Sequence, residues 1–147
     1  VPPDPVQFGV LAGGLIALNE TSDYLADAVT ETENRLKDLL TPSAWLEWLL
    51  LVVLVLPLIA AAEELLFRGV LIGAFGAGTG LHPALLVAGS AVAFGGAHTA
   101  QGWLGVVVAG VLGLLLGGAF YLTGSLWLVI AVHYLLDLVE FARHARA

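Results

Sequence analysis

The stretch of the chain from Gly69 to Leu136 contains no Asp, Glu, Lys or Arg residue. A helix that crosses a membrane needs about 20 predominantly apolar residues, so this uncharged stretch has room for about three crossings. The rest of the sequence agrees, because only 12% of the 147 residues are charged, against about 25% in an ordinary soluble domain. The sequence therefore predicts an all-α integral membrane protein, a polytopic transmembrane helix bundle.

The charge balance and the cysteine content exclude several classes of function. Twelve acidic and five basic residues give a formal net charge of −7. This balance argues against nucleic acid as a partner, because a phosphate-binding surface needs clustered Lys and Arg. The chain has no Cys, so disulfide scaffolds, thiol catalysis and cysteine–zinc sites are excluded. Membrane lipid is the expected surrounding, and the acidic bias with a single Lys and no Met suggests an archaeal halophile as the source.

The charged residues divide the chain into two regions. Ten of the 17 lie in the first 47 residues, so we expect residues 1–42 to hold a short apolar run over Val6–Leu18 and then an acidic, solvent-exposed or interfacial helix over residues 19–42. Residues 43–147 are expected to form the membrane-embedded core, in which Pro and Gly residues separate five apolar helices. These helices are expected over about Ser43–Ala62, Glu63–Ala77, His82–Ala100, Trp103–Leu122 and Ser125–Phe141.

The boundary at Glu63 decides which side of the membrane its carboxylate faces. Pro57 and the adjacent carboxylates of Glu63 and Glu64 favour a chain that turns back there, which places both residues in a first helical turn, where the helix dipole stabilises negative charge. A single crossing over residues 43–77 would instead place Glu63 towards the opposite side from His98.

Polar side chains interrupt the apolar sequence at three places. An ionisable residue inside a membrane is costly, so each is by default a functional hypothesis. Within each group the key residues are four apart, which puts them one turn apart on one face of a helix. Glu64 can then pair with Arg68, and Asp137 can hydrogen-bond to His133 and fix its tautomer. The three groups are Glu63-Glu64-Leu-Leu-Phe-Arg68, Phe94-Gly-Gly-Ala-His98 and His133-Tyr-Leu-Leu-Asp137.

Taken singly, each group also has a structural interpretation. Glu64 and Arg68 can form an ion pair near the membrane interface, and His98 can hydrogen-bond a neighbouring carbonyl group. His133 and Asp137 can act as a polar clamp between helices. Structural roles explain one such group easily and three convergent groups poorly, so we expect the groups to meet at one site within the membrane, near one face.

Two carboxylates and two histidines in a lipid-embedded cavity suit the activation of water. A carboxylate can take a proton from water, and a histidine can share that proton or stabilise an oxyanion. We therefore expect hydrolysis of an amide or ester. A zinc site is the alternative, with Glu63, His98 and His133 as three ligands and water as the fourth. The sequence leaves the cofactor open between a divalent metal such as zinc and none.

The three groups resemble, in order and spacing, the signature motifs of the CPBP family, which covers CaaX proteases and bacteriocin-processing enzymes and is also called the abortive-infection family. The resemblance spans about Pro57 to Leu138. It implies an all-helical intramembrane endopeptidase that cleaves a membrane-associated peptide or protein. Prenylated CaaX proteins are the substrates in eukaryotes, and many microbial relatives act on other peptides.

The resemblance also implies roles for individual residues. In the Ras-converting CaaX endopeptidases of the family, the first Glu and the His of the second motif activate the attacking water; here they are Glu63 and His98. The His of the third motif and its partner serve the oxyanion, here His133 and Asp137. The remaining motif residues, Glu64, Arg68 and Phe94, would support the geometry of the site.

Three questions stay open at the level of the sequence. An ionised Asp only accepts hydrogen bonds, so either Asp137 is protonated or His133 alone donates to the oxyanion. A catalytically silent scaffold or a bacteriocin-immunity protein of the same family is the alternative to an enzyme. Arg143 and Arg146 follow the last helix, so positive-inside counting predicts a multi-pass protein of the cell membrane whose site lies towards the cytoplasmic side.

Overall fold

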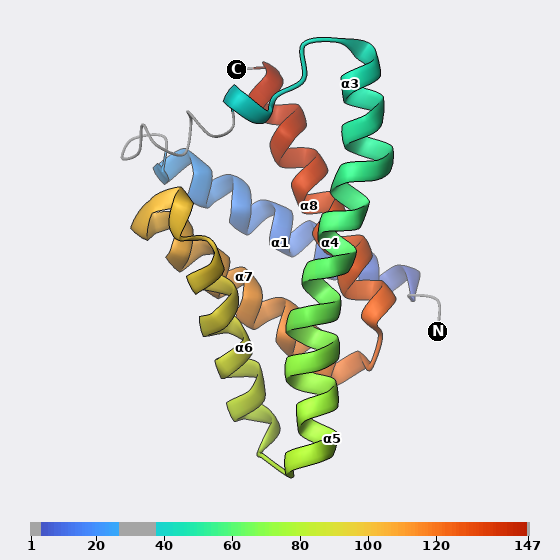
Figure 1. Ribbon diagram of the computed structural model, residues 1–147, viewed down its shortest axis with the longest axis vertical. Helices are drawn as coiled ribbons and strands as arrows, with labels where there is room; N and C mark the ends of the chain where they lie inside the picture. Colours follow the sequence, from blue (N-terminus) through green and yellow to red (C-terminus); the bar gives the residue numbers. More distant parts are fainter. Residues whose placement is uncertain (1–3, 27–37, 147) are drawn as a thin grey trace.

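The computed structural model describes residues 4–26 and 38–146, and no strand occurs among them. Helices make up almost all of the described chain, so the predicted all-α fold is confirmed (Figure 1). The stretches η1 and η2 are π-helical, and η3 is a single 3-10 turn. In chain order the elements are α1 (Pro5–Ala26), α3 (Trp45–Leu50), η1 (Leu51–Val55), α4 (Leu56–Glu64), η2 (Leu65–Ala74), α5 (Phe75–Thr79), α6 (Pro83–Ala97), η3 (Thr99–Gln101), α7 (Gly102–Thr123) and α8 (Leu126–Arg146).

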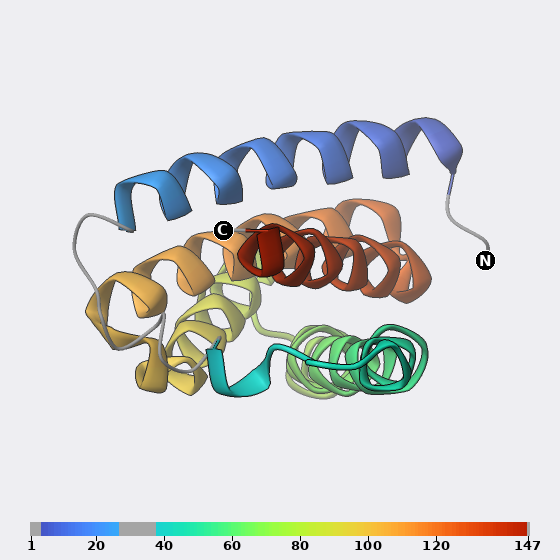
Figure 2. The same ribbon diagram turned by 90° about the horizontal axis from the view of Figure 1, so that it is seen from above.

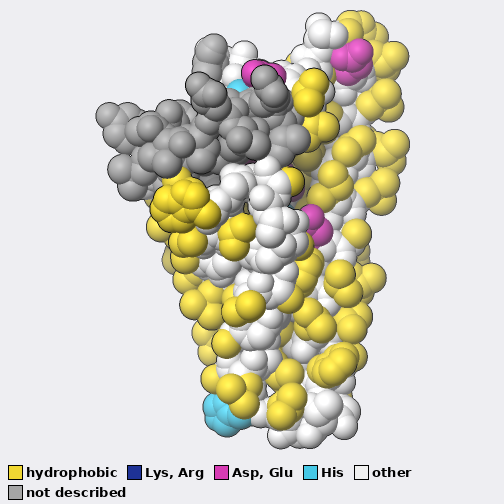
Figure 3. All heavy atoms as spheres, turned by 60° about the vertical axis from the view of Figure 1, so that its left-hand side comes forward, with side chains coloured by type: hydrophobic (Ala, Val, Ile, Leu, Met, Phe, Trp, Pro, Cys, Tyr) yellow, Lys and Arg dark blue, Asp and Glu magenta, His cyan; other side chains and the backbone are white. Residues whose placement is uncertain are grey.

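Two of the described helices are long and apolar enough to cross a membrane. They cover Trp45–Thr79 and Thr99–Thr123, whose most apolar 18-residue windows have mean hydropathies of 2.5 and 2.2; Pro83–Ala97 forms a shorter apolar helix. Only 22% and 28% of their most apolar windows are buried within the protein, whereas the core helix of a soluble protein would be mostly buried. Hydrophobic side chains accordingly cover much of the face in Figure 3. The outer surface suits lipid, as predicted for a transmembrane bundle.

A single continuous helix over Trp45–Thr79 replaces the two helices that the sequence predicted for this region. The chain does not turn back at Glu63, so Glu63 and Glu64 lie in the middle of a helix and not in a first turn. The reversal comes at Gly80, whose φ of 65° is the left-handed conformation that ends many helices. The described chain from residue 45 onward therefore forms four long helices, and the prediction of five is wrong.

The helix continues through Pro57 because a neighbouring helix completes its backbone bonding. The stretch η1 bonds residue i to residue i+5, as the hydrogen bond from the Leu56 N–H to the Leu51 carbonyl shows. The next such bond would run from residue 57 to the Val52 carbonyl, but proline has no N–H. The hydroxyl of Tyr134 on α8 donates to that carbonyl at 2.9 Å. Pro57 is thus tolerated within the helix.

The turn at Gly80 brings α6 back alongside the same long helix (Figure 1). Glu64 precedes this turn by as many residues as His98 follows it. Because the two helices run antiparallel, Glu64 and His98 therefore lie at the same height along the bundle. A single helix was expected to place Glu63 opposite His98. That expectation is wrong, because the helix is 35 residues long and Glu63 lies halfway along it.

Helices α6 and α7 approach each other closely through glycine. A Cβ atom on Gly95 would lie 2.8 Å from the Val106 carbonyl oxygen, and one on Gly113 would lie 3.1 Å from the Phe94 ring. Along α7 a face of small residues that includes Ala109 and Gly113 is buried. This contact holds α6, and with it the second polar group, against the rest of the bundle.

Helix α1 packs along α7 and α8, which separate it from the long helix (Figure 2). Ala12 and Leu15 of α1 are buried against a cluster from α7 and α8 that includes Val132. The sequence predicted an exposed or interfacial helix over residues 19–42. Asn19, at its start, is instead buried, and residues 27–37 lie outside the described part of the chain.

Candidate active site

A buried ion pair joins two of the three charged residues of the first motif, Glu64 and Arg68. Glu64 and Arg68 have no solvent-exposed surface, and Arg68 Nη1 donates to Glu64 Oε1 at 2.9 Å. The guanidinium also donates from Nη2 to the Gly113 carbonyl at 3.1 Å and lies 4.7 Å from the centre of the Phe94 ring. Buried charges are tolerated when they are paired and hydrogen-bonded in this way. The predicted Glu64–Arg68 pair is confirmed.

His133 on α8 is held between carboxylates from two helices. Its Nδ1 lies 2.6 Å from Glu64 Oε1, whereas its Nε2 lies 3.5 Å from Glu63 Oε2 and 3.7 Å from Asp137 Oδ2. The last two distances exceed a direct hydrogen bond. Glu64, not Asp137, is therefore the hydrogen-bonding partner of His133, which corrects the sequence prediction. A carboxylate accepts only, so this network assigns a proton to Nδ1 and turns Nε2 towards Glu63 and Asp137.

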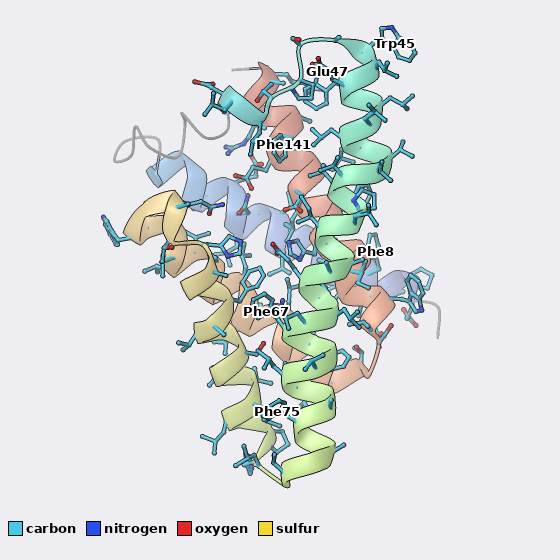
Figure 4. All side chains as sticks on the ribbon, viewed as in Figure 1. Phe8, Trp45, Glu47, Phe67, Phe75 and Phe141 are labelled. Atoms are coloured by element: carbon cyan, nitrogen blue, oxygen red, sulfur yellow. The ribbon has the colours of Figure 1, made fainter. Side chains whose placement is uncertain are left out.

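Phe94 packs the two histidines into one site. Its ring centre lies 4.6 Å from that of His98 and 5.8 Å from that of His133, and the ring meets Phe67 edge-on at 5.1 Å. Figure 4 shows Phe67 between the long helix and α6. His98 follows the last residue of α6, and its Nδ1 lies 2.7 Å from the Phe94 carbonyl oxygen, an acceptor. The Nδ1 atom of His98 therefore donates, and Nε2 is left for other partners.

The four predicted catalytic residues, Glu63, His98, His133 and Asp137, line one cavity of about 400 Å³. The cavity lies between the first half of the long helix and α8, whose Phe141 projects beside it (Figure 4). A smaller cavity of about 90 Å³ shares both histidines and Asp137 and reaches α1 and α7. The larger cavity also has apolar walls, made by Leu40, Leu51, Val55, Leu56, Ile59, Ala97, Ala100 and Phe141.

The sequence prediction missed three polar residues that line these cavities. Gln101 and Glu140 line both cavities, and Asn19 lines the smaller one. Glu140 follows Asp137 by three positions and so shares its helix face, a signal that could have identified it. Gln101 follows His98 within a turn. No local signal marks Asn19, because it reaches the site only through the packing of α1.

The candidate zinc ligands do not form a metal centre here. Among residues 4–26 and 38–146, no group of three or more His, Cys, Asp or Glu side chains is arranged to hold a metal ion. Glu63, His98 and His133 line one cavity, and Nδ1 of each histidine is hydrogen-bonded to a protein oxygen, which leaves Nε2 as the ring nitrogen that faces other partners. We therefore derive no chemical step through a metal.

An apolar helix bundle whose cavity is lined by carboxylates and two histidines, beside a buried ion pair of Glu64 and Arg68, fits the class of intramembrane hydrolases. A family model described as "Type II CAAX prenyl endopeptidase Rce1-like" matches residues 44–139, well over half of the chain. The chain belongs to this family, a membrane-embedded family of CAAX-type proteases, and the resemblance to the CPBP family is confirmed. No curated protein and no solved structure gives a significant match.

Proposed function

We propose that this protein hydrolyses a peptide bond of a membrane-associated substrate of the prenylated CaaX type, using water activated by Glu63 and His98. The observation that carries the proposal is the cavity of about 400 Å³, which combines Glu63 and the two histidines with apolar walls. A carboxylate and imidazoles that line one cavity are suited to proton transfer. The apolar walls suit a prenyl chain or apolar peptide side chains.

In the proposed reaction Glu63 is the general base. Its side chain is 30% exposed, so water can reach it, whereas Glu64 is fully buried. The water oxygen attacks the peptide carbonyl carbon while its proton passes to Glu63, with His98 sharing the transfer. When the C–N bond breaks, this proton goes to the departing amine nitrogen. The other product is a carboxylic acid, which releases the second proton of the water molecule to solvent and becomes a carboxylate.

His133 is proposed to stabilise the oxyanion. In its doubly protonated form it gives one N–H to Glu64 from Nδ1 and presents the other from Nε2, where negative charge develops on the carbonyl oxygen. Arg68 donates to the same Oε1 atom of Glu64. Asp137, 3.7 Å from Nε2, helps to keep the imidazole in its orientation.

A cleavage assay separates this enzyme from a catalytically silent family member. The full chain, reconstituted in lipid nanodiscs, is incubated with a farnesylated peptide that ends in a CaaX sequence, and the released tripeptide is measured by mass spectrometry. We expect cleavage by the wild type and a loss of about 100-fold or more in His98→Ala. His82→Asn is the matched control, because His82 caps the other end of α6 and Asn can replace that cap. An inactive wild type, or equal rates in His98→Ala and the wild type, would contradict the proposal.

The same assay tests metal dependence. Because the described residues assemble no metal centre, we expect cleavage to persist after chelation and dialysis, with less than one equivalent of bound metal by mass spectrometry. Loss of activity on chelation and recovery with Zn²⁺ would contradict this expectation.

We further propose that the protein is a multi-pass protein of the cell membrane with its site towards the cytoplasm. Arg143 and Arg146 lie in the last turn of α8, and positive charge favours the cytoplasmic side. The chain has no Cys, so Ala145→Cys provides a single thiol at an exposed position. We expect an impermeant maleimide to label it only after permeabilisation of cells, and labelling of intact cells would reverse the assignment.

A further inference from the structure

Asn19 interrupts the apolar face by which α1 packs on the bundle. Ala12, Leu15 and Asn19 recur at helical spacing and are each no more than 5% exposed. The first two contact the apolar cluster of α7 and α8. One turn beyond Leu15, this buried face carries a carboxamide where an apolar residue would continue the packing.

The placement of Asn19 brings it to the candidate active site. It lines the cavity of about 90 Å³ together with His98, His133 and Asp137. Helix α1 lies outside residues 44–139, so the family match does not account for this contribution. The site is thus completed by a helix that lies beyond the matched region.

The chemistry of the cavity gives the carboxamide a specific use. Asp137 and Glu140 also line this cavity, and ionised carboxylates only accept hydrogen bonds. A substrate carbonyl oxygen needs donors, which the histidines and the amide groups of Asn19 and Gln101 can supply. Gln101 follows the bend at the end of α6 and is half-buried, whereas Asn19 is 5% exposed on a packed helix. A donor that is held in place before the reaction is the more effective one.

We propose that Asn19 donates a side-chain N–H to the carbonyl oxygen of the scissile peptide bond, beside His133. This inference rests on the proposed peptidase function. As water adds to the carbonyl carbon, negative charge grows on that oxygen, so the hydrogen bond strengthens towards the transition state. Asn19 thereby supplies the neutral donor that an ionised Asp137 cannot supply.

A polar clamp between α1 and its neighbours would also bury an asparagine, and the two roles predict different measurements. A clamp changes the stability of the protein and the position of α1. A transition-state donor changes kcat and leaves KM nearly unchanged. The test therefore needs both readouts, with a control variant that loosens α1 without reaching the cavity.

The experiment compares Asn19→Leu, Asn19→Asp and Leu15→Ala as full chains in nanodiscs, with the farnesylated CaaX peptide as substrate. We expect kcat to fall about 100-fold in Asn19→Leu at unchanged KM. Asn19→Asp has the same shape but cannot donate when ionised, so it should also lose kcat, and it tests the proposal if the Leu variant fails to fold. Leu15→Ala should lower the unfolding midpoint in SDS and keep kcat near the wild-type value.

Wild-type kcat in a folded Asn19→Leu or Asn19→Asp protein would overturn the inference and leave the peptidase function intact. An equal loss of kcat in Leu15→Ala would also overturn it, because docking of α1 would then explain the effect. An inactive wild type would overturn the peptidase function and this inference together.

Discussion

At the scale of single residues, Glu64 links the first and third motifs. One of its oxygens, Oε1, accepts hydrogen bonds from Arg68 on its own helix and from His133 on α8. The first contact could be predicted, because residues four apart on a helix are neighbours. The second could not, because the same rule also makes Asp137 a neighbour of His133. Only the packing of α4 against α8 decides between the two carboxylates.

Replacing Arg68 with Met is expected to lower the free energy of unfolding by about 3 to 5 kcal/mol, because it leaves the buried charge of Glu64 without its guanidinium partner. An SDS unfolding titration of the purified proteins measures the loss. The double variant Glu64→Gln/Arg68→Met removes both charges and should recover much of the stability. Unchanged stability in Arg68→Met would contradict a net-stabilising ion pair.

At the scale of helices, the sequence located most of the apolar segments and misplaced one boundary. Pro57 and the paired carboxylates favoured a break, but the π-helical stretch η1 and the Tyr134 hydroxyl carry the helix through the proline. The donor of that hydrogen bond lies on another helix, so local sequence rules cannot predict the bond. A second example is the Ser90 hydroxyl, which donates to the Phe67 carbonyl in η2 at 2.6 Å.

Alanine substitutions of two neighbouring glycines test the close contact between α6 and α7. Gly95→Ala would place a Cβ atom 2.8 Å from the backbone oxygen of Val106, so we expect a loss of about 1 to 3 kcal/mol in stability. The activity should fall as well, because the adjacent Phe94 positions both histidines. Gly96→Ala is the control, since a Cβ there meets nothing within 4 Å. Equal thermal unfolding midpoints of the two variants would contradict the packing.

At the scale of the whole molecule, the site is assembled by one long hairpin and three further helices, α1, α7 and α8. The three motifs could be recognised from residue types and spacing, and so could the cavity chemistry that they suggest. That Glu64 and His98 lie at the same height in the bundle could not be predicted, because it depends on a turn at Gly80 rather than at Glu63. The presence of Asn19 at the site depends on how α1 packs against α7 and α8, and no local sequence pattern predicts that packing.

The most direct test of water activation by Glu63 is the kcat of Glu63→Gln on the farnesylated CaaX peptide in nanodiscs. Glutamine keeps the shape of the side chain but cannot accept the proton, so we predict a loss of about 100-fold or more in kcat with the protein correctly inserted. Glu47→Gln is the matched control, because Glu47 is exposed at the far end of the same helix (Figure 4), and its activity should equal that of the wild type. Wild-type kcat in Glu63→Gln would contradict the central claim.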